Sequence, residues 1–230
     1  MLATSRKFQR SALSVAFFLF ALILIPFWPQ AVLAQDLALI AAAGRGASAA
    51  VQRLLREGAS VHTRDGRGRT ALLAATHGNR VEAARLLIAA GADVNAKDAI
   101  EDSPFLYAGA EGRNEILKMT LAAGADLKST NRYGGTALIP AAHHGHVETV
   151  QLLLATGIDK DHVNRLGWTA LLEAVVLGDG GPKHIAIVRL LVAAGANVNL
   201  ADGDGVTPLA HARRRGFAAM AGILLGAGGR

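Results

Sequence analysis

The chain has 230 residues, 24 of them basic and 18 acidic, and contains no cysteine. Without cysteine, disulfide bonds, a cysteine nucleophile and a lipid-modified cysteine are all excluded. The formal net charge of +6 is scattered along the chain, so we expect no nucleic-acid partner.

The first 34 residues have the three regions of a secretory signal peptide. Arg6, Lys7 and Arg10 form a positive start, and residues 12–25 form an apolar run. Val32, Leu33 and Ala34 are residues that are small or accepted at a signal-peptide cleavage site. We therefore expect cleavage after Ala34, a periplasmic protein and no stable membrane insertion after cleavage; secretion is the alternative. The apolar run is shorter than the ~20 residues that span a bilayer. An uncleaved membrane anchor is the second interpretation of this segment.

A unit of 33 residues repeats along the remaining chain, with one interval of 38. Two positions show this period most clearly, a hydroxyl residue at Thr70, Ser103, Thr136, Thr169 and Thr207, and a glycine at Gly58, Gly91, Gly124, Gly157 and Gly195. The period predicts units over about 35–64, 65–97, 98–130, 131–163, 164–201 and 202–230 within one domain, residues 35–230.

Each unit predicts two helices. In the second unit, the Thr70 hydroxyl is placed to cap a helix that begins at Ala71, and a second helix begins at Val81. Gly91 is expected to end that helix, because glycine adopts a positive φ without strain. In the first unit, the first helix is expected at about 37–43. One unit cannot bury its apolar faces alone, so the units must stack into a solenoid.

Several segments resemble the Thr-Pro-Leu-His signature of ankyrin repeats: Ser103-Pro104-Phe105, Thr136-Ala137-Leu138, Thr169-Ala170-Leu171 and Thr207-Pro208-Leu209. The stretch from Gly91 to Asn95 resembles the same family's helix terminator. The resemblance covers roughly residues 36–228 and implies an all-α ankyrin-repeat solenoid of about six helix-turn-helix units with finger loops. The signature histidine is replaced in every unit.

Other motifs predict little chemistry. No serine lies in a nucleophile-elbow pattern, so we expect no catalytic residues, and we expect no cofactor. His143, His144 and His146 could be metal ligands, but the repeat register assigns them to the end of a helix and the following turn, so no metal is expected. Five extra residues, 179–183, lie between the helices of the fifth unit, and are interpreted as a surface loop or a partner contact.

The resemblance implies a non-catalytic scaffold that binds another protein on the face formed by finger loops and first helices. The corresponding residues are Arg67, Arg69, Ile100, Arg132, Tyr133, His143, His144, Arg165, Leu166 and Trp168. Trp168 could instead belong to the core. The protein is expected to be a monomer. The alternatives are a dedicated companion or protector of a periplasmic enzyme, linked to oxidative stress, and a secreted effector that acts on host proteins.

Overall fold

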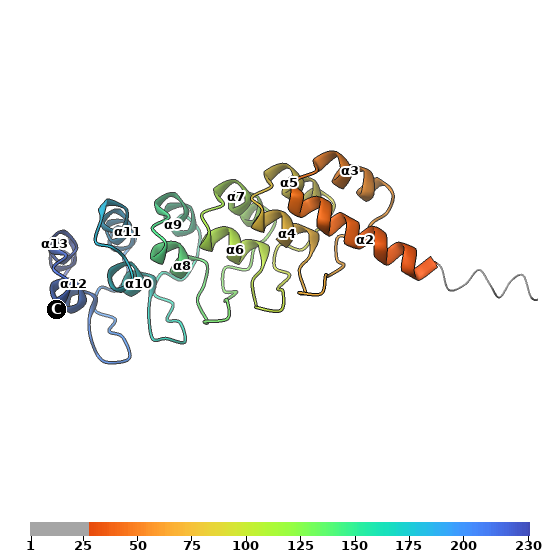
Figure 1. Cartoon of the computed structure of the whole chain (residues 1–230). Helices are drawn as coiled ribbons and strands as arrows, with labels where there is room; N and C mark the ends of the chain where they lie inside the picture. The colour runs from red at the N-terminus through yellow and green to blue at the C-terminus, as the bar shows by residue number, and fades with distance from the viewer. Residues whose placement is uncertain (1–27) are drawn as a thin grey trace, which may run out of the picture.

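A computed structural model describes residues 28–230. The regular secondary structure of these residues is helix, and the helices follow one another in pairs. Figure 1 shows two stacked rows, with the first helices of the pairs in one row, the second helices in the other, and long loops hanging from the row of first helices. The pairs are α2 (Trp28–Arg45) with α3 (Ser48–Arg56), α4 (Ala71–His77) with α5 (Val81–Ala89), α6 (Pro104–Ala110) with α7 (Asn114–Ala122), α8 (Leu138–His143) with α9 (Val147–Leu154), α10 (Ala170–Val176) with α11 (Pro182–Ala193), and α12 (Pro208–Arg214) with α13 (Ala218–Gly226).

Two columns of buried residues form the core at the repeat period. In the first helices the same position is almost completely buried in five successive units, at Leu72, Phe105, Leu138, Leu171 and Leu209. In the second helices the corresponding column is Leu87, Thr120, Leu153, Leu191 and Leu224. Thr120 is the polar exception, and its hydroxyl donates to the Leu117 carbonyl at 2.9 Å. Each unit therefore completes its core only by packing on its neighbours.

The first helices begin at side-chain caps, as expected from the hydroxyl position. Thr70 Oγ1 accepts a hydrogen bond from the Leu73 N–H at 3.3 Å, and Ser103, Thr169 and Thr207 make the same contact in their units. At the other end of the second helix, Gly91 has φ +84°, which confirms its role after the helix.

Thr136 is the exception to the cap expectation, because its buried hydroxyl has no hydrogen-bond partner. In the second unit, Ala74 N–H bonds to the Thr70 carbonyl at 3.0 Å. The corresponding residue of the fourth unit is Pro140, which has no N–H. The Thr136 carbonyl accepts from the Ile139 N–H instead, at 3.2 Å, so that donor is no longer free for the hydroxyl. The expected cap is therefore wrong here, and α8 begins two residues after Thr136.

This difference predicts opposite results for two isosteric substitutions. Thr70→Val should lower the free energy of unfolding by about 1 kcal/mol, because it removes a working helix cap. Thr136→Val should leave that free energy unchanged or raise it by up to about 1 kcal/mol, because a buried hydroxyl without a partner is lost. Urea denaturation of the two variants measures both. Equal destabilisation by the two would contradict the assignment.

The finger loops share a second capping device that the repeat pattern alone did not reveal. The Asn131 side chain Oδ1 accepts from the Tyr133 and Gly135 N–H groups at 2.9 and 3.0 Å. Asp65, Asp98, Asn164 and Asp202 do the same at the corresponding places of their own loops. Adjacent fingers are also joined, since Arg165 N–H donates to the Tyr133 carbonyl at 2.9 Å. The fingers are thus held in fixed positions beside one another.

Residues 179–183 form a surface connection in which Asp179, Pro182 and Lys183 are exposed and the two glycines are half-buried. The inserted segment leads directly into α11, and Pro182 is the first residue of that helix. His184 is buried, with its Nδ1 2.8 Å from Asp179 Oδ1 and its Nε2 donating to the His143 carbonyl at 2.8 Å. Gly180 lies against the Phe217 ring, where a Cβ atom would come within 2.4 Å. Gly180 therefore packs against the last unit, while Asp179 contacts the fifth unit's own second helix through His184.

The first helix differs from the expectation of 37–43, because α2 runs from Trp28 to Arg45. Residues 28–36 are therefore helical as well, ahead of the expected start. Asp36 connects the helix to the next turn, with Oδ1 accepting from the Ser60 N–H at 2.8 Å and Oδ2 from the Thr63 hydroxyl at 2.6 Å. Helix α2 continues across the predicted cleavage site, and residues 1–27 of the predicted signal peptide lie outside the described residues. None of the described helices has the length and apolar character needed to cross a membrane.

Candidate protein-binding groove

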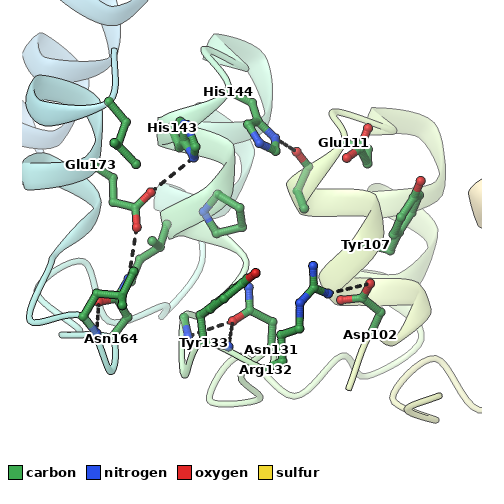
Figure 2. A pocket seen from close by; sticks show the side chains of 16 residues that line it. Asp102, Tyr107, Glu111, Asn131, Arg132, Tyr133, His143, His144, Asn164 and Glu173 are labelled. Carbon is green, nitrogen blue, oxygen red and sulfur yellow. Dashed lines mark hydrogen bonds and ion pairs between the residues drawn. The ribbon is translucent and has the colours of Figure 1, made fainter. Parts of the chain in front are cut away.

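A groove of about 510 Å³ runs over the third, fourth and fifth units on the side of the finger loops and first helices. Figure 2 shows it between α6 and α10, with α8 along its middle. Its lining residues are Asp102, Tyr107, Ala110, Glu111, Asn131, Arg132, Tyr133, Gly135, Ile139, Pro140, His143, His144, Asn164, Leu166, Glu173 and Leu177.

The lower edge of the groove, as drawn in Figure 2, is formed by finger residues. Tyr133 is 51% exposed and Leu166, from the next finger, is 56% exposed. The guanidinium of Arg132 lies 4.9 Å from the centroid of the Tyr133 ring, and its Nη1 is 3.8 Å from Asp102 Oδ2. Large apolar side chains and a cation–π pair therefore border this edge.

A carboxylate with an unusual environment lies in the groove wall. The Glu173 side chain is only 8% exposed. Its Oε1 accepts from Asn164 Nδ2 at 3.0 Å, and its Oε2 is 3.4 Å from His143 Nδ1. Burial raises the pKa of Glu173 to about 7, although the Asn164 hydrogen bond opposes the rise. Burial also lowers the pKa of His143.

The histidines turn toward different partners. His144 Nδ1 donates to the Ala110 carbonyl at 2.7 Å, whereas His143 lies against Glu173. The His144 and His146 rings meet edge to face, with 5.8 Å between their centroids. Within residues 28–230, no three His, Cys, Asp or Glu side chains are placed to hold a metal ion together. The contacts of these histidines are with the protein itself.

Half of the residues expected from the resemblance line the groove: Arg132, Tyr133, His143, His144 and Leu166. The other five lie outside it, and two of them connect parts of the fingers. Arg165 Nη1 donates to the Arg132 carbonyl at 2.8 Å, and Arg69 pairs with Asp65 at 2.7 Å. Arg67 and Ile100 are exposed in their own fingers, and Trp168 is half-buried.

Several groove residues were missed, although the repeat contains a signal for them. Glu173 occupies one position of the first helix that changes completely between units: Ala74, Tyr107, Pro140, Glu173 and His211. In the last unit, His211 Nε2 lies 2.6 Å from the finger residue Asp202, as Glu173 contacts Asn164 in the fifth. A position that varies so much in charge and size between repeats of one fold is not one of the recurring apolar core positions of the repeat. Comparing the units position by position would have found it.

A second hollow of about 590 Å³ lies toward the N-terminus, between α2 and α4. Arg69 and His77 line it. On its other side, His77 stacks on Tyr107, with 3.9 Å between the ring centroids. Tyr107 belongs to the groove lining, so the His77 ring supports the groove from behind.

Comparison with known proteins finds the same repeat family. A profile of the ankyrin repeat family, Ankyrin repeats (3 copies), matches residues 22–98 and 105–202. The putative ankyrin repeat protein YahD of Escherichia coli (strain K12) is 54% identical over 56 residues, which are 24% of this chain and 28% of that protein.

Similar solved structures cover a larger share of this chain. An ankyrin repeat domain from Acinetobacter baumannii AYE has 57% identity and a TM-score of 0.82, covering 84% of this chain and 98% of that one. The ankyrin repeat protein EF0377 has 43% identity and a TM-score of 0.79, covering 82% and 96%. The ankyrin repeat domain of Bcl-3, a member of the IkappaB family, has 30% identity and a TM-score of 0.75, covering 84% and 86%. Ankyrin repeats are protein interaction scaffolds and typically non-catalytic. With a profile match over more than half its length and a solenoid of helix pairs with finger loops, the chain belongs to the ankyrin repeat family.

Proposed function

We propose that the protein is a non-catalytic periplasmic scaffold that holds a partner protein in the groove over the third to fifth units. The observation that carries the proposal is the pair Tyr133 and Leu166. Both side chains are more than half exposed, and they stand on adjacent fingers at the rim of one groove. Exposed aromatic and aliphatic side chains around a hollow are the usual anchors of a protein interface.

The fixed geometry of the fingers supports this proposal. Arg165 joins the two fingers through its backbone, to the Tyr133 carbonyl, and through its guanidinium, to the Arg132 carbonyl. A surface that is already ordered loses little conformational entropy when it binds. The groove can therefore bind a partner without a change of its own shape.

A pull-down tests the proposal directly. The full-length protein and its Tyr133→Ala/Leu166→Ala variant are immobilised and exposed to envelope extract of the source cells. We expect the variant to bind the partner at least about tenfold more weakly, because it loses two interface anchors. Its melting temperature should stay nearly unchanged, since neither side chain is in the core.

The matched control for this experiment is Ile100→Ala. Ile100 is 50% exposed and stands on the preceding finger, outside the groove lining. It should retain partner binding. Loss of binding in Ile100→Ala, with binding retained in the double variant, would move the interface to the earlier fingers and contradict the proposal.

The periplasmic location rests on the sequence of the first 34 residues, with a positive start, an apolar run and a candidate cleavage site after Ala34. The intact mass of the protein recovered from the periplasmic fraction reports whether the chain begins at Gln35. An uncleaved mass in the membrane fraction would replace this part of the proposal by an anchored scaffold.

The number of captured proteins separates the remaining alternatives. One abundant partner, lost in the double variant, favours a dedicated companion or protector of a periplasmic enzyme, including one that serves under oxidative stress. Several partners favour a general adaptor. Recovery of the protein outside the producing cell favours an effector that acts on host proteins.

A further inference from the structure

The groove is acidic although the protein as a whole is basic. The chain carries a formal net charge of +6, yet three carboxyl groups line the groove: Asp102, Glu111 and Glu173. Glu111 follows the end of α6, and Glu173 lies in α10, so two of these groups stand on opposite walls. Residues 35–230 hold 21 basic and 18 acidic residues (24 − 3 = 21), so the lining, with three carboxyl groups and one arginine, has a formal charge of the opposite sign.

Little within the groove compensates these carboxyl groups. Arg132 is the one Lys or Arg side chain in the lining, and its guanidinium lies next to Asp102. Glu111 makes no ion pair with any residue between 28 and 230. Glu173 lies next to His143, whose pKa is lowered by burial. Among the three carboxyl groups of the lining, only Asp102 therefore has a Lys or Arg side chain beside it.

Glu173 has further capacity to accept hydrogen bonds. A carboxylate offers about four acceptor positions. Asn164 uses one of them on Oε1, and His143 is at 3.4 Å from Oε2. Because burial disfavours the ionised form, an incoming cation at this place would recover the cost of desolvation and stabilise the ionised carboxylate. A guanidinium or ammonium group is the natural complement.

We infer that the partner segment presents an arginine or lysine to the Glu173 and Glu111 walls and an apolar side chain, close by in sequence, to Tyr133 and Leu166. This inference rests on the proposed function of the groove and names the chemistry of its partner. The cation supplies the charge that the walls lack, and the apolar neighbour covers the exposed rim. Charge complementarity of this kind also excludes acidic segments from the groove.

The test begins with a library of random 12-residue peptides displayed on phage and selected on the full-length protein. We expect the selected peptides to share an arginine or lysine within a few residues of an aliphatic or aromatic residue. The tightest peptide is then synthesised together with a copy in which the arginine or lysine is replaced by a neutral isostere, citrulline for arginine or norleucine for lysine. Fluorescence anisotropy measures both against wild type, Glu173→Gln and the control Glu82→Gln, an exposed glutamate of α5.

The charged peptide should bind Glu173→Gln about tenfold more weakly than wild type and should bind Glu82→Gln as it binds wild type. The neutral copy should bind wild type and Glu173→Gln equally, because the cation and the carboxylate act as one pair. Selected peptides that are acidic or purely apolar, or a neutral copy that binds wild type as well as the charged peptide does, would overturn the inference.

The same experiment separates this inference from the proposed function. Peptides that lack a cation but lose affinity for the Tyr133→Ala/Leu166→Ala variant would leave the groove as the interface and remove only its preference for a basic segment. Peptides that bind the double variant as well as wild type, or no selected peptides at all, would count against the groove itself.

Discussion

Replacing Phe105 by alanine is expected to lower the free energy of unfolding by about 3–5 kcal/mol. Phe105 is completely buried, and its ring is the largest among the fully buried side chains of the described residues. It stands in the buried column of the first helices, between Leu72 and Leu138 of the neighbouring units. The truncation leaves a cavity at two inter-unit contacts at once, and the rigid backbone of the helices cannot close it.

The position of Phe105 also predicts a change in the shape of the unfolding transition. The stability of a solenoid is approximately a sum of unit terms and nearest-neighbour contacts. Weakening the third unit should therefore uncouple the two ends, and urea denaturation followed by circular dichroism should show a broader transition or two transitions. Phe105→Leu, which keeps most of the volume, should cost less than about 1.5 kcal/mol. A single unfolding transition in Phe105→Ala with the midpoint and steepness of wild type would contradict this account of the core.

Glu173→Gln is expected to make the protein more stable above neutral pH. The folded-state pKa of Glu173 is about 7, above the ordinary value of 4.5. Between these two pH values the folded state binds more protons than the unfolded state, so stability falls as pH rises. The cost is absent below about pH 4.5 and complete above about pH 7. With solvent screening taken into account, it is about 1–3 kcal/mol.

The measurement is the urea midpoint of wild type and Glu173→Gln at pH 5 and pH 8. Glutamine keeps an oxygen for the Asn164 hydrogen bond and cannot ionise, so the variant should gain over wild type at pH 8 and have a similar stability at pH 5. The groups that face Glu173 are His143, His144 and Asn164. The control Glu82→Gln should follow wild type at both pH values. An equal difference between Glu173→Gln and wild type at pH 5 and pH 8 would show that burial does not raise this pKa.

Two of the expected interaction residues, Tyr133 and Leu166, could be placed in the groove from the repeat register alone. Tyr133 and Leu166 follow the asparagines that begin their fingers, and fingers of stacked units lie side by side. The residues of the groove walls could not be assigned from the repeat register. Glu173 lies within α10, and sequence alone does not distinguish a helix residue that faces the groove from one that faces solvent. Only the variation at one repeat position, from Ala74 to His211, carried a hint of it.

The opposite error occurred at the arginines. Arg69 and Arg165 have the composition of interface residues, but their guanidinium groups are engaged within and between the fingers. An arginine side chain reaches several ångströms, so its partner depends on which backbone carbonyls and carboxylates surround it in space. Residue type alone therefore overestimated the free binding surface.

By itself, the sequence determined the repeat period, the hydroxyl caps of most first helices, the glycine after the second helices and hence the ankyrin solenoid. These features are local or strictly periodic, because each unit repeats the same helix caps and the same buried positions. The tertiary structure decided the features that depend on departures from the repeat. Pro140 leaves Thr136 without a donor, Gly180 of the insertion packs against the last unit, and Glu173 is buried beside Asn164 and His143. Such contacts join residues of different units, and their energies arise from packing and burial that no single unit contains.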